Sequence, residues 1–245
     1  MHKKGRSGLA RALSKVGYCS RSRATALVRA GRVTLNGRSV RDPETAVRME
    51  RDHIRVDGSA VEERPKIYLM MNKPRGVVTT ASDEKGRATV YNLLDPGTNK
   101  EWISPVGRLD KASEGILLFT NDSNWAAKIT DPASHLDKRY HVQVDRVAVN
   151  DLLARIRQGV SVGGDLLRGK EARVLRVGSK NSWLEITLDE GKNRHIRRLL
   201  EALGVQVLRL VRVAVGPLEL GDLKKGTARS LTEKEKRLVD QAFNG

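Results

Sequence analysis

The stretch Gly107-Arg108-Leu109-Asp110-Lys111-Ala112-Ser113-Glu114-Gly115-Ile116-Leu117-Leu118-Phe119-Thr120 joins a polar segment to a continuous apolar run. The apolar run predicts a buried strand over 116–120, and the glycine-flanked residues before it predict a loop. A rigid strand fixes the position of the loop that precedes it, and such loops often carry catalytic groups. Asp110 lies in this loop and is therefore a candidate catalytic carboxylate, although an isolated aspartate here could also be an ordinary turn residue.

Further patterns around this stretch indicate the fold class. Strands are expected at 67–72, 76–80, 140–144, 172–177 and 183–188, and helices near 125–129, 149–158 and 194–203. An irregular mixture of this kind, without regular βαβ repeats, is typical of an α+β domain with an antiparallel or mixed sheet. We expect this domain to span 67–245 and a polar linker, 59–66, to precede it.

The residues before the linker show a separate pattern of two short helices followed by a small sheet. Ser20 is a suitable N-cap for the second helix, and Gly31 is a suitable residue just after its end. Asn36-Gly37 lies between two short β patterns and is a strong hairpin signal. These residues predict a small N-terminal domain over 7–58.

The charge of the chain favours nucleic acid as the partner. Lys and Arg total 46 against 29 Asp and Glu, a formal net charge of +17, and no acidic residue precedes Asp42. A positive field of this size attracts polyanions and speeds their capture. The second N-terminal helix is expected to bring together four guanidinium groups suited to phosphate oxygens, those of Arg21, Arg23, Arg29 and Arg32.

Other classes of site and location are disfavoured. Cys19 is the single cysteine, so the chain cannot form an internal disulfide, and a reducing cytoplasmic location fits. No apolar run is long enough for a membrane span. The five histidines lack metal-ligand spacing, and the P-loop-like segment 164–170 is followed by Glu171 where Ser or Thr would bind magnesium. We therefore expect no metal, no cofactor and no membrane contact.

A second motif, Asp189-Glu190-Gly191-Lys192-Asn193-Arg194-His195-Ile196-Arg197-Arg198-Leu199-Leu200, begins a helix. Its apolar residues form one buried stripe, and its three arginines lie largely off that stripe. A guanidinium directed at Asp110 would keep the carboxylate ionised and oriented. The alternative is that these arginines only cover the helix surface.

Three segments of the second domain resemble the RsuA/RluB group of pseudouridine synthases. They are Asn72–Val78, Gly107–Asp110 with its following strand, and Glu190–Arg198. Lys138-Arg139-Tyr140-His141-Val142 is similar to the tyrosine motif of that family. The N-terminal segment from Leu9 to Asp57 resembles the alpha-L RNA-binding motif of ribosomal protein S-four. The resemblance covers nearly the whole chain, with His195 standing where glutamine or glutamate is frequent.

This resemblance implies a cofactor-free rRNA pseudouridine synthase. The implied fold is α+β, with a small alpha-L RNA-binding domain before a mixed, mainly antiparallel sheet that contains a central active cleft. Asp110 would act on the ribose as nucleophile or as base, Tyr140 would stack on the uracil, and Arg197 would pair with Asp110. Arg108 would occupy or brace the space that the flipped base leaves. The remaining positions expected to contact substrate or RNA are Lys73, Arg194 and Arg198.

The resemblance also indicates the RNA. Segment 191–198 followed by 205–212 is closer to enzymes of large-subunit (23S) rRNA than to the small-subunit (16S) enzyme, and we expect a monomer acting on rRNA or an assembly intermediate. The alternative is a non-catalytic rRNA-binding or ribosome-assembly factor, which would have no need of Asp110 in an electropositive groove. A methyltransferase would need a glycine-rich cofactor loop after a first strand, which the sequence lacks.

Overall fold

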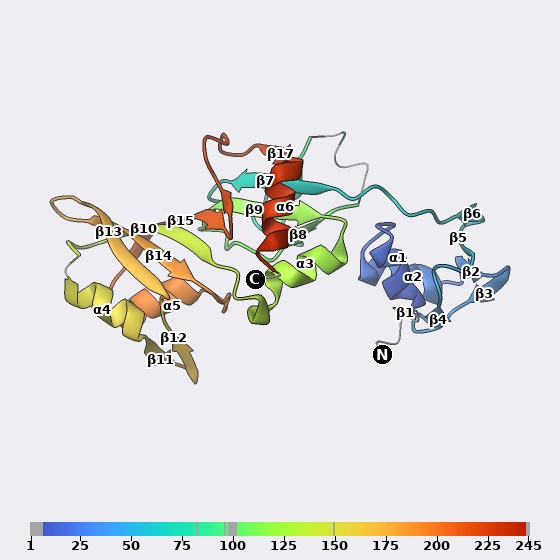
Figure 1. The fold of residues 1–245 in the computed structure, drawn as a ribbon, viewed down its shortest axis with the longest axis horizontal. Helices are drawn as coiled ribbons and strands as arrows, with labels where there is room; N and C mark the ends of the chain where they lie inside the picture. The colour runs from blue at the N-terminus through green and yellow to red at the C-terminus, as the bar shows by residue number, and fades with distance from the viewer. Residues whose placement is uncertain (1–6, 82, 96, 98–101, 149, 244–245) are drawn as a thin grey trace. The chain divides into compact units, whose positions relative to one another are not determined.

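The computed structural model describes residues 7–81, 83–95, 97, 102–148 and 150–243 (Figure 1). The chain divides into two compact units. The first, here called the N-terminal unit, comprises 1–68, 95–104 and 119–127. The second, here called the sheet unit, comprises 69–94, 105–118 and 128–245.

The N-terminal unit contains the expected two helices and small sheet. Its elements are β1 (Ser7–Gly8), α1 (Leu9–Lys15), α2 (Arg21–Arg29), β2 (Val33–Leu35), β3 (Arg38–Val40), β4 (Ala46–Val47), β5 (Ile54–Val56) and β6 (Ser59–Ala60). The sheet order is β3-β2-β5-β6, and β1 pairs separately with β4. Strand β6 therefore occupies the first two residues of the expected linker.

Local sequence signals account for α2 and the hairpin after it. The Ser20 hydroxyl accepts a hydrogen bond from Arg23 N at 3.1 Å, which satisfies one of the free N–H groups at the start of α2. Gly31, just after the helix, has a φ of 74°. Asn36 and Gly37 both have positive φ, 51° and 83°, as a type I′ turn between β2 and β3 requires.

The sheet unit is built on a long mixed sheet with the order β13-β14-β10-β15-β9-β7-β17. Its strands are β7 (Tyr68–Lys73), β8 (Ser104–Val106), β9 (Glu114–Thr120), β10 (Lys138–Val144), β13 (Glu171–Val177), β14 (Ser182–Leu188), β15 (Val207–Val215), β16 (Leu218–Glu219) and β17 (Ala228–Ser230). Strand β10 is antiparallel to β14 and β15, β13 to β14, and β17 to β7, whereas β15 runs parallel to β9. The expected mixed, mainly antiparallel sheet is confirmed.

The helices and the remaining short elements complete the chain. They are η1 (Val90–Leu93), α3 (Ser123–Thr130), η3 (Pro132–Ser134), α4 (Asn150–Gln158), the hairpin of β11 (Val160–Val162) and β12 (Asp165–Leu167), α5 (His195–Ala202) and α6 (Glu233–Gln241). None of the described helices is long and apolar enough to cross a membrane. The P-loop-like segment 164–170 forms the second strand of the hairpin and its exit, which agrees with its dismissal as a phosphate loop.

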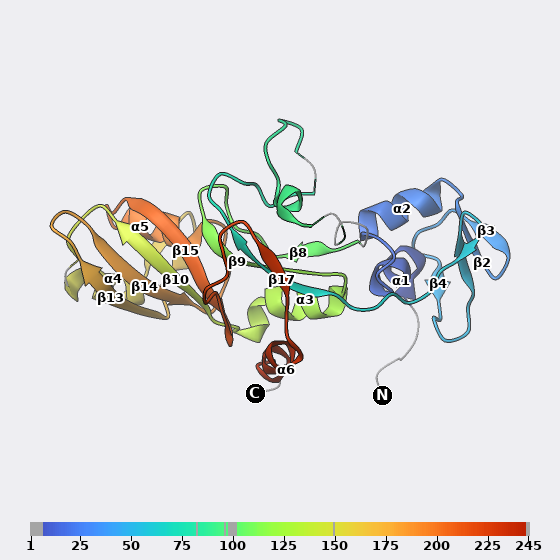
Figure 2. The same ribbon diagram turned by 90° about the horizontal axis from the view of Figure 1, so that it is seen from above.

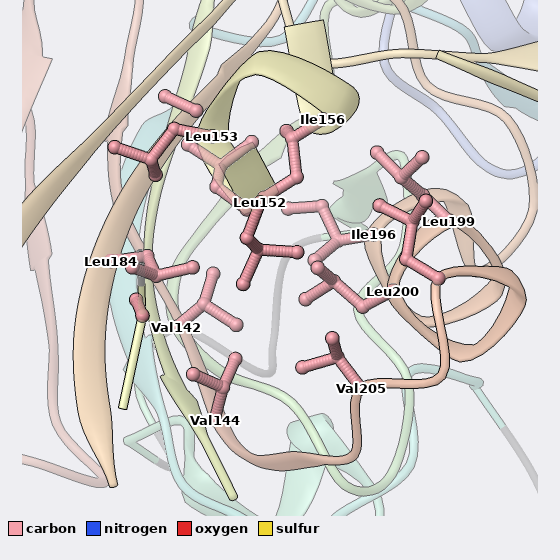
Figure 3. Close-up of a cluster of buried hydrophobic side chains, with 14 of the residues drawn as sticks. Val142, Val144, Leu152, Leu153, Ile156, Leu184, Ile196, Leu199, Leu200 and Val205 are labelled. Atoms are coloured by element: carbon pink, nitrogen blue, oxygen red, sulfur yellow. The ribbon is translucent and has the colours of Figure 1, made fainter. Parts of the chain in front are cut away.

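Helices α4 and α5 pack on one face of the sheet and bury its main core (Figures 2 and 3). Alternate residues of β10, Val142 and Val144, are fully buried there, because successive side chains of a strand point to opposite faces. In Figure 3 they face two groups of helix residues, Leu152, Leu153 and Ile156 from α4 and Ile196, Leu199 and Leu200 from α5. This core fixes the first turn of α5, which carries part of the site described below.

For the sheet unit, one expected strand is absent and two elements were not predicted. Residues 76–80 do not form a strand; Val78 makes an isolated bridge with Thr89 instead. The backbone turns at Gly76, whose N–H donates to Lys111 O at 2.7 Å, so docking on another loop prevails over β propensity. The sequence analysis also missed β15 and α6, although Thr232 and Glu235 form a capping box at the start of α6.

Candidate active site

A pocket with a volume of about 300 Å³ lies in the sheet unit next to the parallel contact of β9 and β15. These strands are in register at Val211–Glu114 and Arg212–Gly115. Asp110, Tyr140 and Arg108, selected from the sequence, all line this pocket. Leu188 and Ile196 supply apolar surface there. The structure therefore brings the aspartate loop and the tyrosine strand together.

A buried lysine holds the Asp110 loop in place. The side chain of Lys73 is fully buried, and its Nζ donates to Asp110 O at 3.1 Å, Ser113 O at 2.9 Å and Pro74 O at 3.1 Å. Burial lowers the pKa of Lys73 to about 8. Lys73 was expected to contact substrate or RNA, but an ammonium with all three donors engaged beneath the loop supports a positioning role.

The start of β9 is fastened to β15 by further cations. The carboxylate of Glu114 accepts from Arg209 Nε at 2.7 Å and from Lys225 Nζ at 2.6 Å. Burial raises the pKa of Glu114, but these hydrogen bonds outweigh it and leave the pKa below its usual value. Arg212 Nε donates to Ile116 O at 2.8 Å. The strand that follows Asp110 is thus anchored at two alternate residues.

The arginines of the α5 motif do not lie as expected. Arg194 Nη1 is 3.9 Å from Asp110 Oδ2, whereas Arg197 donates through Nη2 to Ala112 O at 3.1 Å. Arg197 therefore makes no direct ion pair with Asp110 here, although the carboxylate is close enough to raise the pKa of Arg197, against the larger lowering by burial and Arg194. Arg194 precedes α5 in a left-handed conformation (φ 48°), and Arg197 lies nearly one helical turn further along. Arg198 instead binds the β11–β12 hairpin, with Nη1 3.0 Å from Asp165 Oδ2.

Tyr140 lies on β10 opposite Arg212 of β15 and Ile186 of β14. Its ring is half-buried and packs against the main core of the sheet unit. An aromatic ring at the pocket wall is suited to stacking on a flat heterocycle. The pocket thus combines a carboxylate, an aromatic face and several cations.

The sequence matches two families. Residues 67–202 match the family described as RNA pseudouridylate synthase, and residues 8–54 match the S4 domain. The chain belongs to the RNA pseudouridylate synthase family. It is an RNA pseudouridine synthase, an isomerase, of the RsuA/RluB type with an N-terminal S4 RNA-binding domain.

Relatives and a solved structure agree with this assignment. A Bacillus subtilis (strain 168) protein named Ribosomal large subunit pseudouridine synthase B is 35% identical over 240 residues, 97% of each chain. An uncharacterized RNA pseudouridine synthase of Aquifex aeolicus (strain VF5) is 37% identical over 224 residues, 91% of this chain and 89% of that one. A crystal structure described as pseudouridylate synthase matches with a TM-score of 0.67 and 28% identity, covering 95% of this chain and 99% of that chain.

His195 is the first residue of α5 in the synthase and is buried at the pocket wall. Its Nε2 lies 3.1 Å from Arg168 N and 3.0 Å from Arg168 O, and its Nδ1 lies 3.5 Å from Glu190 Oε1. Burial lowers the pKa of His195. This histidine therefore ties the segment that carries Arg194 to the exit of the β11–β12 hairpin.

The four arginines selected in the S4 domain of the synthase are exposed but differ in their pairing. Arg32 forms a two-pronged ion pair with Asp57, with contacts of 2.8 and 2.5 Å, and Arg21 lies 3.5 Å from Glu44. Arg23 and Arg29 have no acidic partner within the described part of the chain. These two guanidinium groups are the better candidates for phosphate contacts.

The sequence analysis missed three pocket cations of the synthase, Lys138, Lys192 and Arg212. Lys138 is two residues before Tyr140 on β10, so strand alternation could have placed it on the same face. Arg212 carried no such local signal, since it reaches the pocket only through the pairing of β15 with β10 and β9. Among the described residues, no group of three His, Cys, Asp or Glu side chains could hold a metal ion.

Proposed function

We propose that this synthase converts a uridine of ribosomal RNA to pseudouridine, with large-subunit rRNA favoured, and that Asp110 is its catalytic carboxylate. The observation that carries the proposal is the position of Asp110 in a pocket shared with Tyr140 and Arg194. The preference for large-subunit rRNA rests on the name of the Bacillus subtilis relative, which is 35% identical. A non-catalytic RNA-binding role would leave without a purpose a carboxylate that lines the pocket on a loop fastened by Lys73 and Arg197.

The proposed reaction rearranges one nucleotide without a cofactor. The bond between ribose C1′ and uracil N1 breaks, the ring turns within the pocket, and C1′ joins C5. The proton on C5 is lost and N1 gains one, so substrate and product are isomers. Asp110 acts on the ribose as nucleophile or base, and either chemistry needs the rigid placement that Lys73 and Arg197 give its loop.

Unpaired cations near Asp110 form the proposed RNA-binding rim of the pocket. Arg75, Arg108 and Lys111 are exposed and have no acidic partner in the ranges that the structure describes. The pKa of Arg197 is lowered mainly by burial and then by Arg194. Arg75 is also close enough to Arg197 to lower that pKa by a smaller amount. A uridine in a stem must leave the base stack before it can react, and contacts to flanking phosphates can offset that cost.

The proposed division of labour assigns RNA positioning to residues 7–58 and chemistry to residues 67–245, with 59–66 as the connection. Point substitutions test it better than deletion within the N-terminal unit. Arg64 N donates to Val16 O at 3.0 Å and Lys66 Nζ to Lys15 O at 2.9 Å, so a deletion would also remove packing contacts.

Arg23→Gln and Arg29→Gln are each expected to weaken rRNA binding and flatten its salt dependence. Each lost phosphate contact should remove roughly 0.7 to 0.9 from the slope of log affinity against log salt. The single-turnover rate at saturating RNA should change little, because neither residue contacts the pocket. The matched control is Arg237→Gln on α6, which should keep the wild-type slope; unchanged slopes in the S4 variants would contradict the division.

The target is tested by mapping pseudouridines in rRNA from cells that lack the gene. We expect one 23S site to lose its modification and to regain it with the wild-type gene but not with a gene encoding Asp110→Asn. A lost site in 16S rRNA would contradict the subunit preference. An unaltered rRNA pattern, together with no activity of the purified protein on rRNA fragments, would contradict the proposed function.

A further inference from the structure

Lys138 presents a half-buried ammonium group at the wall of the active pocket. Within the described residues, it has no hydrogen-bond acceptor and no ion-pair partner. The neighbouring acid, Asp137, is engaged by another lysine, with both carboxylate oxygens 2.9 Å from Lys170 Nζ. The charge of Lys138 is therefore left without a direct counterion.

The strand geometry places this ammonium beside the proposed uracil site. Lys138 and Tyr140 are alternate residues of β10 and both line the pocket. The pocket also contains the buried Arg212 and, on its opposite loop, Asp110. The pocket is also lined by Arg108 and Arg194, on the segments beside Asp110, and by Lys192, which is ion-paired with Glu190 at 3.0 Å. A base stacked on Tyr140 with its ribose at Asp110 would have Lys138 and Arg212 among the positive groups around it.

The reaction creates an anion that such a site can stabilise. When the bond from C1′ to N1 breaks, its electron pair stays with the uracil ring and spreads over N1, C5 and the two carbonyl oxygens. We propose that Lys138 is a catalytic residue that stabilises this negative charge on the detached ring. The inference rests on the proposed function, since it requires Asp110 to hold the ribose at the same time.

The balance of the step needs no additional reactant. With Asp110 as the nucleophile, its carboxylate oxygen bonds to C1′ as the bond from C1′ to N1 breaks. The uracil anion then turns, and its electron pair at C5 forms the new bond to C1′ while the bond from C1′ to Asp110 breaks. The proton of C5 is then lost and a proton is taken up at N1. Lys138 keeps its proton throughout and acts through charge, which is the usual form of transition-state stabilisation by a preorganised cation.

The electrostatics of the pocket agree with this role. Burial, and then the neighbouring Arg212, lower the pKa of Lys138, whereas Asp137 and Asp189 raise it less. The ammonium is thus disfavoured before the reaction and gains a partner when the ring becomes negative. Interactions that strengthen only as charge develops raise the rate of the chemical step rather than substrate affinity.

The test is Lys138→Met, assayed at saturating rRNA fragment in a single turnover. We expect the rate to fall by about 10² to 10³-fold, as for loss of one group that stabilises a developing anion, and RNA affinity to change less than tenfold. Lys138→Arg should recover part of the rate because it keeps the positive charge. Lys180→Met, in the exposed turn between β13 and β14, is the matched control and should behave as wild type.

A second substrate separates charge stabilisation from simple positioning. With 5-fluorouridine at the target, the electron-withdrawing fluorine makes the detached ring a weaker base. The loss caused by Lys138→Met, measured as disappearance of the N1-linked nucleotide, should then be several-fold smaller. Equal losses on both substrates, or a wild-type rate in Lys138→Met, would overturn the inference. Absence of turnover by the wild-type protein would instead overturn the proposed function.

Discussion

Asp110→Asn is expected to lower the single-turnover rate of pseudouridine formation by at least about 10³-fold, the scale for losing a group that acts directly on the reacting atoms. Asparagine has nearly the same shape, but its amide can neither attack the ribose nor remove a proton from it. The loss should therefore appear in the chemical step at saturating RNA.

Folding and RNA binding should survive this change. The loop is held through backbone atoms of residue 110, whose carbonyl accepts from Lys73, and asparagine keeps that carbonyl. The Asp110 side chain is 35% exposed, and its ion pair with Arg194 is long, at 3.9 Å. Such a pair contributes about 0 to 1 kcal/mol. RNA affinity should be equal or slightly higher, because a negative charge leaves a pocket that receives a polyanion.

The measurement compares rate, affinity and thermal unfolding for wild type, Asp110→Asn and the control Asp222→Asn, which removes an exposed carboxylate near the end of the chain. We expect the three proteins to have nearly equal unfolding midpoints and similar RNA affinities. Only Asp110→Asn should lose the rate of pseudouridine formation. Substantial turnover by Asp110→Asn, or a rate lost only together with folding, would contradict the assignment.

The sequence predicted correctly those helix ends and turns that are determined by residues close together in the chain. Ser20, Gly31 and Asn36-Gly37 act through caps and turn conformations that neighbouring residues determine, and the structure shows each of them as expected. The segment 76–80 shows the limit of this reasoning. Its β-branched residues favour a strand, but the contact of Gly76 with Lys111, 35 positions along the chain, prevails.

The site was predictable in its chemistry but not in its detailed contacts. The position of Asp110 before a buried strand was readable from the sequence, and the pocket contains it as expected. A sequence shows that Lys73 is charged but not that it is fully buried beneath the loop. Likewise, the motif contains three arginines, and the sequence alone does not show which of them forms an ion pair with Asp110. In the structure it is Arg194, whereas Arg197 donates to Ala112 O.

The junction of β9 and β15 explains why a glycine stands at position 115. Gly115 has a φ of 100°, a conformation that L side chains rarely adopt. It is paired with Arg212 across the parallel contact, and a Cβ added to it would lie 2.1 Å from Arg212 O and 2.8 Å from Arg212 N. Both obstacles are backbone atoms, so neither can be relieved by rotating a side chain.

Gly115→Ala is therefore expected to be among the most damaging single substitutions in the sheet unit. The left-handed conformation costs about 1 to 2 kcal/mol for a residue with a Cβ, and overpacking adds about 1 to 3 kcal/mol. The sum is a large part of a typical unfolding free energy of about 5 to 15 kcal/mol. Any relief must separate β9 from β15, which displaces Arg212 and the loop of Asp110, so catalysis should fall even in molecules that remain folded.

Gly226→Ala is the matched control, because Gly226 also has positive φ (81°) but has nothing within 4 Å of an added Cβ. Gly226→Ala should lower the free energy of unfolding only by the cost of placing a residue with a Cβ at positive φ. Urea unfolding of both variants separates the two contributions, and turnover per folded molecule reports the displacement of the site. Equal destabilisation by the two substitutions would show that the close approach of Arg212 is not limiting. Normal turnover by Gly115→Ala would show that the β9–β15 contact does not set the geometry of the pocket.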